Sequence, residues 1–287
     1  MTEIATVVQA HDSLGECCLW CPRTRRLWWL DINKPCLQSF DPVSRTHRVY
    51  PLPGRNCGCA GLRASGGLVL AIGCGLHGFD PATGKLEPLL AVEPDLPDNR
   101  FNDGRCDRRG RLWIGTLDCE LRRASGSFYR IGADRSVSRL FDAITVPNST
   151  AFSPDDRTLY FCDTFQHAIW AFDFDIDAGA ISNRRVFADL TGRKGTPDGS
   201  CVDAQGYLWN AEYGHRHLVR YAPDGRVDRT IDLPVTNPTC CCFGGDNLDT
   251  LYVTSAAQGL TAPASIEGAL LAVDVGVRGL PEATFGG

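Results

Sequence analysis

The sequence predicts an all-β fold, a six-bladed β-propeller of four-stranded blades, and three observations support this prediction. A short apolar phrase built around a leucine recurs six times, clusters of turn-forming residues fall late in the repeats, and capped stretches with helical periodicity are absent. Successive leucines are 41, 44, 47, 49 and 43 residues apart, an interval that accommodates about four short strands. The leucines are Leu27, Leu68, Leu112, Leu159, Leu208 and Leu251.

Each repeat predicts the strands and turns of one blade in the same order. Apolar segments such as residues 168–172 and 218–221 are typical of strands, because they are short and rich in β-branched and aromatic side chains. Segments rich in Asp, Pro and Gly are typical of tight turns, and they cover residues 41–44, 80–84, 132–134, 175–179 and 222–225. The N-terminal segment from Thr2 to Gln9 has strand composition, so we expect it to complete the sheet of the last blade. We therefore expect residues 1–287 to form a single closed propeller domain.

The composition excludes several classes of protein. Hydrophobic residues make up 43% and charged residues 22% of the chain, as in ordinary globular domains, and no apolar run approaches a membrane span. The net charge of −5 argues against a nucleic-acid partner, which would require clustered Lys and Arg. The N-terminus shows no secretory signal, so we expect a cytoplasmic protein whose partner is a small molecule. The sequence gives no indication of the oligomeric state.

Several short motifs do not hold up in their sequence context. Residues 73–78 spell GxGxxG, but a turn follows instead of the helix that a dinucleotide site requires. Residues 173–177 resemble the start of an EF-hand loop, yet Ala178 and Arg184 occupy the positions that require Gly and Glu. No GxSxG segment supplies a serine nucleophile. Most of the fourteen cysteines are expected to be free, buried thiols, because reducing compartments disfavour disulfides.

The strongest functional signal is a set of residues ten or eleven positions before the repeat leucines. Four of these six residues are carboxylates or amides. The six are Glu16, Gly58, Asn102, Asn148, Asp198 and Cys241. Because equivalent positions of a repeat occupy equivalent places, we expect the four polar side chains to converge on the propeller axis. Two carboxylates and two amide oxygens suit a hard divalent cation, although polar turn residues that cap the blades would give the same pattern.

These residues also carry a resemblance to a known family. The segments concerned are 14–16, 100–104, 147–148, 152–155, 197–199 with 203 and 206–209, and 242–245. Together they resemble the gluconolactonase, regucalcin and luciferin-regenerating-enzyme family of six-bladed propellers over nearly the whole chain. The resemblance implies that Glu16, Asn148 and Asp198 bind one divalent metal ion.

The same resemblance implies a catalytic function. Asp198 would also serve as the catalytic base, and Arg100, Asn102 and Glu120 would contact a sugar lactone. The implied reaction is hydrolysis of an aldono-1,4- or 1,5-lactone, such as glucono-, xylono-, arabino- or galactonolactone, to the aldonic acid. A cation would act as a Lewis acid on the lactone carbonyl while a carboxylate takes a proton from water.

Two departures from the family pattern leave alternatives open. Ser149 follows Asn148 where glycine is common in the family. The sequence phase also places Cys57, Cys59, Cys240 and Cys241 toward the channel, either as soft ligands that favour zinc or as small apolar fillers. The metal ion could therefore be Ca, Mg, Mn, Zn or Fe.

The biochemical role also has alternatives on the same scaffold. One is a calcium-binding regulatory protein like regucalcin, and a second is a propeller that serves protein interactions alone. A promiscuous lactonase or phosphotriesterase is the third.

Overall fold

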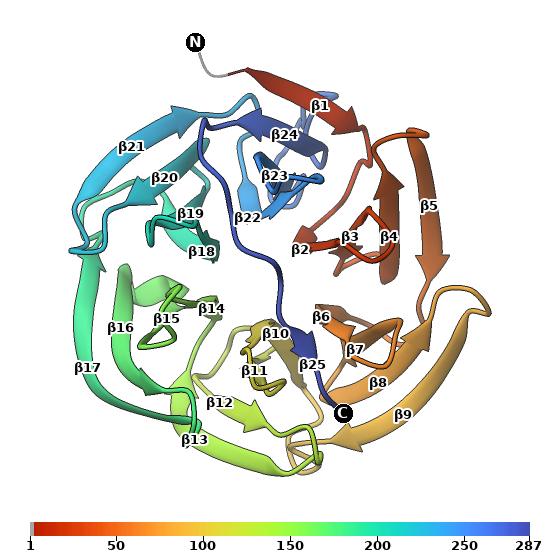
Figure 1. Cartoon of the computed structure of the whole chain (residues 1–287), viewed down its shortest axis with the longest axis vertical. Helices are drawn as coiled ribbons and strands as arrows, with labels where there is room; N and C mark the ends of the chain where they lie inside the picture. Colours follow the sequence, from red (N-terminus) through yellow and green to blue (C-terminus); the bar gives the residue numbers. More distant parts are fainter. Residues whose placement is uncertain (1–2) are drawn as a thin grey trace.

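The computed structural model describes residues 3–287 and confirms the predicted all-β six-bladed propeller. Six sheets, each with four antiparallel strands, are arranged around a central axis, and one of them gains a fifth strand (Figure 1). Blade one comprises β2 (Gly15–Cys21), β3 (Arg26–Asp31), β4 (Cys36–Asp41) and β5 (Thr46–Pro51). Blade two comprises β6 (Cys57–Arg63), β7 (Leu68–Ile72), β8 (Gly75–Asp80) and β9 (Lys85–Ala91). Blade three comprises β10 (Asn99–Cys106), β11 (Leu112–Asp118), β12 (Gly126–Ile131) and β13 (Val137–Ile144).

The other three blades follow the same order along the chain. Blade four comprises β14 (Pro147–Phe152), β15 (Thr158–Asp163), β16 (Ala168–Asp175) and β17 (Ala180–Asp189). Blade five comprises β18 (Thr196–Val202), β19 (Leu208–Tyr213), β20 (His217–Tyr221) and β21 (Val227–Asp232). Blade six comprises β22 (Pro238–Gly244), β23 (Thr250–Ser255), β24 (Leu270–Asp274) and β1 (Ile4–Val8). The short 3₁₀ helix η1 (Thr164–Gln166) follows β15, and no helix within residues 3–287 is long and apolar enough to cross a membrane.

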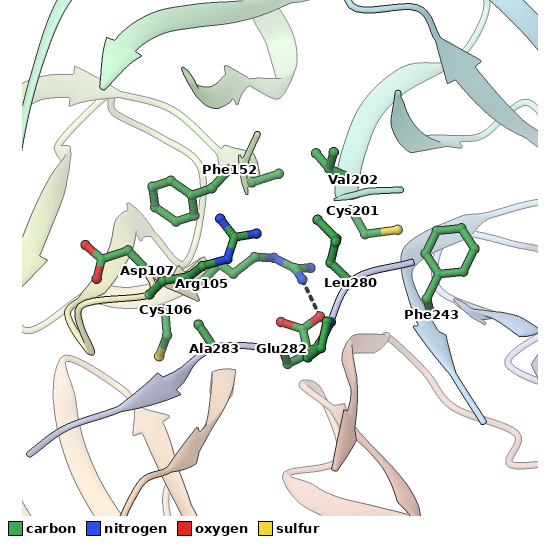
Figure 2. A pocket seen from close by; sticks show the side chains of 13 residues that line it. Arg105, Cys106, Asp107, Phe152, Cys201, Val202, Phe243, Leu280, Glu282 and Ala283 are labelled. Carbon is green, nitrogen blue, oxygen red and sulfur yellow. Dashed lines mark hydrogen bonds and ion pairs between the residues drawn. The ribbon is translucent and has the colours of Figure 1, made fainter. Parts of the chain in front are cut away.

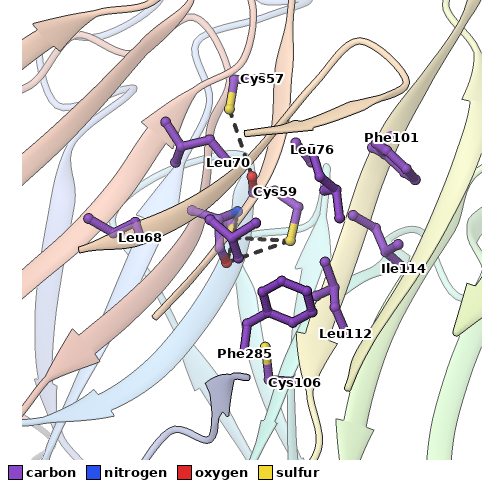
Figure 3. Close-up of a cluster of buried hydrophobic side chains, with 14 of the residues drawn as sticks. Cys57, Cys59, Leu68, Leu70, Leu76, Phe101, Cys106, Leu112, Ile114 and Phe285 are labelled. Atoms are coloured by element: carbon purple, nitrogen blue, oxygen red, sulfur yellow. Dashed lines mark hydrogen bonds between the residues drawn. The ribbon is translucent and has the colours of Figure 1, made fainter. Parts of the chain in front are cut away.

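The repeat leucines begin or adjoin the second strand of each blade, and they build the core between blades. All six are at most 2% exposed. Between blades two and three, Leu68 and Leu112 pack in one cluster with Phe285 from the C-terminus (Figure 3). The turns that enter these strands are fixed by buried indoles, since Trp113 Nε1 donates to Asp107 at 2.8 Å and Trp209 Nε1 to Asp203 at 3.0 Å.

The N-terminal strand closes the ring as predicted. β1 pairs antiparallel with β24 and becomes the outermost strand of blade six, so the first and last segments of the chain share one sheet. Thr2 lies outside the described residues, and the described strand runs over Ile4–Val8. Closure through this strand joins the chain ends without leaving a blade incomplete.

A C-terminal strap, residues 275–287, crosses the channel, and the sequence did not predict it (Figure 1). After β24 the strap passes blade five, where Gly279 forms an isolated bridge with Asp203. It then ends in β25 (Thr284–Phe285), which pairs parallel with β6 and makes blade two five-stranded. The strap meets the ends of the innermost strands, because the bridge lies just after β18 and β25 pairs with the last residues of β6.

Candidate metal and catalytic site

Four of the predicted site residues, Glu16, Asn102, Asn148 and Asp198, lie at bulges near the beginnings of four innermost strands. The ladder shifts register between Glu16 and Leu19 in β2 and between Asn148 and Ala151 in β14. Equivalent shifts surround Asn102 in β10 and Asp198 in β18. A bulge places two residues opposite one and redirects a side chain, so each strand can present a polar group without losing its sheet.

The residue after a metal-ligand candidate adopts a left-handed backbone in two of these bulges. Cys17 has φ 52° and Ser149 has φ 59°, in the region that glycine adopts most readily. The Ser149 hydroxyl donates to the Asp198 carbonyl at 2.7 Å, which couples the bulge of blade four to that of blade five. This hydrogen bond gives a physical reason for serine at a position whose backbone conformation would favour glycine.

Buried carboxylates anchor the loops that lead into two of the bulged strands. Asp31 accepts the backbone N–H groups of Ser13 and Leu14, at 2.8 and 3.2 Å, just before Glu16. Asp163 accepts the N–H groups of Thr145 and Val146 in the same way, at 3.0 and 2.9 Å, just before Asn148. The same pair of hydrogen bonds in two blades fixes the positions of Glu16 and Asn148 along the channel axis.

Three carboxyl groups, those of Glu16, Asp103 and Asp198, lie close enough together for their charges to interact. Burial, together with the negative charge of Asp103, raises the pKa of Glu16 to about 7. Burial raises the pKa of Asp198 well above its usual value, and the charges of Glu16 and Asp103 add to this effect. Burial also raises the pKa of Asp103, whose carboxylate accepts the Thr150 N–H at 2.6 Å. The arrangement disfavours full ionisation of these groups unless a cation lies between them.

Arg100, Asn102 and Asn148 form a chain of hydrogen bonds that distinguishes an amide bound to a guanidinium from an amide suited to a metal ion. Arg100 Nη1 donates to Asn102 Oδ1 at 2.7 Å, as expected if both side chains point to one side of the strand. Asn102 Nδ2 donates in turn to the Pro147 carbonyl at 2.9 Å and to Asn148 Oδ1 at 3.1 Å. Since the Asn102 oxygen already faces a guanidinium, Asn148 is the better amide ligand for a cation. Glu16, Asn148 and Asp198 therefore fit a divalent ion as an oxygen set.

Glu120 lies apart from this cluster. It is exposed in the connection between β11 and β12, where its backbone N–H donates to Asp118 at 3.1 Å. It lies beside Cys119, whose thiol is close enough to Arg100 for their charges to interact. Glu120 thus stands at the rim of the site, and its contact with a substrate stays a prediction.

Sequence reasoning missed two polar residues at the site. Thr164 Oγ1 accepts Asn148 Nδ2 at 2.8 Å and donates to the Pro197 carbonyl at 3.0 Å. Tyr213 lies near both carboxylates, since burial together with Asp198 and Glu16 raises its pKa to about 12. Both residues stand five positions after a repeat leucine, so the same phase argument applied to the second strand would have found them.

The prediction that Cys241 occupies the position equivalent to the ligands is wrong. The bulge of β22 falls between Pro238 and Cys241, so Thr239 occupies the ligand-equivalent place and Cys241 pairs with Val253 beyond it. A hydrogen bond from Cys201 together with burial raises the pKa of the Cys241 thiol well above its usual value, and burial does the same for Cys57. Neutral thiols are poor metal ligands.

All fourteen cysteines are free, and residues 3–287 hold no group of three His, Cys, Asp or Glu side chains suited to a metal ion. A cation site in this region therefore depends on the Asn148 amide beside the two carboxylates. The structure favours the interpretation of the channel cysteines as small fillers.

Comparisons with known proteins agree on one family. A family model described as "SMP-30/Gluconolactonase/LRE-like region" matches residues 14–257. L-arabinolactonase of Azospirillum brasilense is 39% identical over 260 residues, covering 89% of this chain and 85% of that protein. The 6-deoxy-6-sulfogluconolactonase of Pseudomonas putida is 36% identical, with 98% of each chain covered. The structure of regucalcin from Agrobacterium tumefaciens, described as a calcium-binding protein, aligns with a TM-score of 0.94 at 32% identity and covers 99% of this chain and 97% of its own.

Proposed function

Since the chain belongs to the SMP-30/gluconolactonase/LRE-like family, we propose that it is a metal-dependent hydrolase that opens a sugar lactone to its aldonic acid. The observation that carries the proposal is the cluster of Glu16, Asp103 and Asp198, which are largely shielded from solvent and close enough for their charges to interact. Carboxyl groups whose pKa values are raised by burial and by one another suit a divalent cation, and the lactonases among the relatives supply the reaction class.

Glu16, Asn148 and Asp198 would hold the cation. The bound cation would polarise the lactone carbonyl and stabilise the negative charge that develops on its oxygen. Asp198 would accept the proton of the attacking water, for which a carboxylate with a raised pKa is suited near neutral pH. A cation lowers that pKa, and the negative charges of Glu16 and Asp103 offset part of this effect.

The other residues would position the substrate. Arg100 has donors to spare after its bonds to the Phe101 carbonyl and Asn102 Oδ1, so it can hold sugar hydroxyl groups or a ring oxygen. Asn102 would keep both Arg100 and Asn148 in place through its hydrogen bonds to their side chains. The proposed substrates are aldono-1,4- and 1,5-lactones, with arabinonolactone and gluconolactone first because of the named relatives.

A lactone panel tests this proposal. Purified protein is assayed by pH-stat on arabinono-, glucono-, xylono- and galactonolactone and on a phosphotriester, beside Asp198→Asn. We expect hydrolysis of at least one sugar lactone that the substitution abolishes. Binding of Ca²⁺ without hydrolysis of any lactone would instead support a regulatory protein like regucalcin. Faster hydrolysis of the phosphotriester than of every lactone would indicate a phosphotriesterase.

A further inference from the structure

The C-terminal strap lies at the ends of the innermost strands, whereas Glu16, Asn148 and Asp198 lie near their beginnings. Its backbone reaches four blades, since Gly279 N–H donates to the Leu248 carbonyl at 2.8 Å and Ala204 N–H to the Arg278 carbonyl at 2.8 Å. Farther along, Ala64 N–H donates to the Phe285 carbonyl at 2.9 Å. Gly286 N–H donates to the Gly110 carbonyl at 3.0 Å, and the Phe285 ring is fully buried. The strap is therefore a fixed part of the propeller.

The strap supplies one carboxylate, that of Glu282, to the interior of the propeller. Glu282 lies between the Gly279 bridge and β25, and it forms an ion pair with Arg105 that is largely shielded from solvent (Figure 2). A small cavity of about 50 Å³ adjoins this pair, lined by Phe152, Cys201 and Leu280 among others. Arg105 stands one residue before the end of β10, so its side chain starts at the strap and extends into the channel.

The guanidinium of Arg105 uses its remaining donors on the two neighbouring site strands. Nε donates to the Thr150 carbonyl in β14 at 3.1 Å, and Nη2 donates to the Ser200 carbonyl in β18 at 2.9 Å. Thr150 is two residues after Asn148, and Ser200 is two residues after Asp198. One planar group on β10 thus fixes the bulges that present two of the three proposed metal ligands.

We propose that Arg105, held by Glu282 of the C-terminal strap, is the positioning residue that sets the separation of Asn148 and Asp198. The inference rests on the proposed metal site. Three donors of one rigid fork meet three different segments, a geometry that the single ammonium group of lysine cannot reproduce. Glu282 balances the charge of the buried guanidinium and keeps its plane facing both carbonyls. The strap thereby contributes to the ligand geometry without touching the ligands.

Mn²⁺ binding to the full chain, measured by titration calorimetry, tests the inference in Arg105→Gln, Arg105→Lys and Glu282→Gln. Arg220→Gln is the matched control, because Arg220 is also a buried arginine with carboxylate partners, Asp203 and Asp228, but donates to neither bulge. We expect both glutamine substitutions of arginine to lower the melting temperature. The Arg105 variants and Glu282→Gln should weaken Mn²⁺ binding by about 10- to 100-fold, with Glu282→Gln nearer the lower figure, and Arg220→Gln should leave it unchanged. Equal weakening in Arg220→Gln, or unchanged binding in Arg105→Gln, would overturn the inference.

Hydrogen–deuterium exchange of the metal-free proteins separates this inference from the proposed function. Removing the guanidinium should speed exchange of backbone amides in residues 147–152 and 196–202, and the Arg220 control should not. If the wild-type protein binds no Mn²⁺, the proposed metal site fails, and the exchange experiment still decides whether Arg105 fixes the bulges. Unchanged exchange in these segments of Arg105→Gln would contradict the positioning role. If Arg105→Gln does not fold, unchanged exchange in Glu282→Gln would contradict it instead, because that variant keeps the guanidinium and removes only the charge that holds it.

Discussion

Replacement of Glu16 by glutamine should stabilise the metal-free protein while it removes metal binding. Glutamine has nearly the shape of glutamate, and its side-chain oxygen can still accept the Cys17 N–H, which lies 2.9 Å from the carboxylate. The substitution therefore deletes one negative charge from the cluster that contains Asp198 and Asp103 and changes little else. When no cation is bound, the change should remove repulsion between the carboxylates and the cost of ionising Glu16.

The magnitude follows from the pKa of Glu16 in the metal-free fold. Its pKa is 4.5 in the ordinary state and about 7 in the structure, chiefly because of burial. At about 1.4 kcal/mol per pH unit, this difference corresponds to about 3 kcal/mol, an upper bound for a side chain with partial solvent contact. Below pH 4.5 the group is protonated in both states and stability is unaffected. As the pH rises toward 7 and beyond, folding must either retain a proton or ionise a buried carboxylate, and stability is lost.

Thermal unfolding of chelator-treated wild type and Glu16→Gln at pH 5 and pH 8 measures the effect. At about 2 °C per kcal/mol in a chain of this size, the variant should melt up to about 6 °C higher at pH 8 and nearly level with wild type at pH 5. Glu120→Gln, a substitution of an exposed glutamate, should change neither melting temperature nor Mn²⁺ affinity. A metal-free Glu16→Gln protein that is less stable than wild type at pH 8 would refute the electrostatic account of the site.

The remaining predictions concern ligands, substrate contacts and pH. Asp198→Ala should abolish lactone hydrolysis and weaken metal binding in calorimetry. Asp173→Ala should do neither, because Asp173 is exposed and pairs with Arg185. Equal effects of the two substitutions would contradict the assignment of Asp198 as a ligand and base. Asn102→Ala should lower kcat/KM about 10- to 100-fold, the loss of about 1–3 kcal/mol, with metal content near wild type in elemental analysis; a protein purified without metal would make Asn102 a ligand. Mn²⁺ affinity should fall as the pH drops from 8 to 6, since protons compete for the raised-pKa carboxylates Glu16 and Asp198; pH-independent affinity would contradict this.

The repeat made the fold predictable, because the phase of one leucine per blade sets both blade number and strand order. The same phase brought Glu16, Asn148 and Asp198 to one end of the channel. It failed at Cys241, because the bulge of blade six begins two residues earlier relative to Leu251 and presents Thr239 instead. A bulge moves by one or two residues without changing the apolar pattern of its strand, so residue spacing alone does not fix which side chain faces the axis.

The C-terminal strap and Arg105 lie outside what the sequence could predict. β25 is two residues long and pairs with a strand more than two hundred positions away, so no local periodicity marks it. Arg105 precedes the end of a strand that also carries Asn102, yet its partners Thr150, Ser200 and Glu282 come from three other segments. The metal ion, the sugar and the cytoplasmic localisation stay predictions, because they depend on ligand geometry and cellular context that residue types do not encode.

The central claim is that a cation among Glu16, Asn148 and Asp198 is required for lactone opening, and reconstitution tests it most directly. Protein stripped with chelator and dialysed is titrated with Mn²⁺ while arabinonolactone and gluconolactone hydrolysis is followed by pH-stat. The account predicts no hydrolysis above background in the stripped protein and full recovery at one equivalent of metal per chain, with no recovery in Asp198→Asn. Hydrolysis that survives complete removal of metal, or recovery in Asp198→Asn equal to wild type, would contradict it.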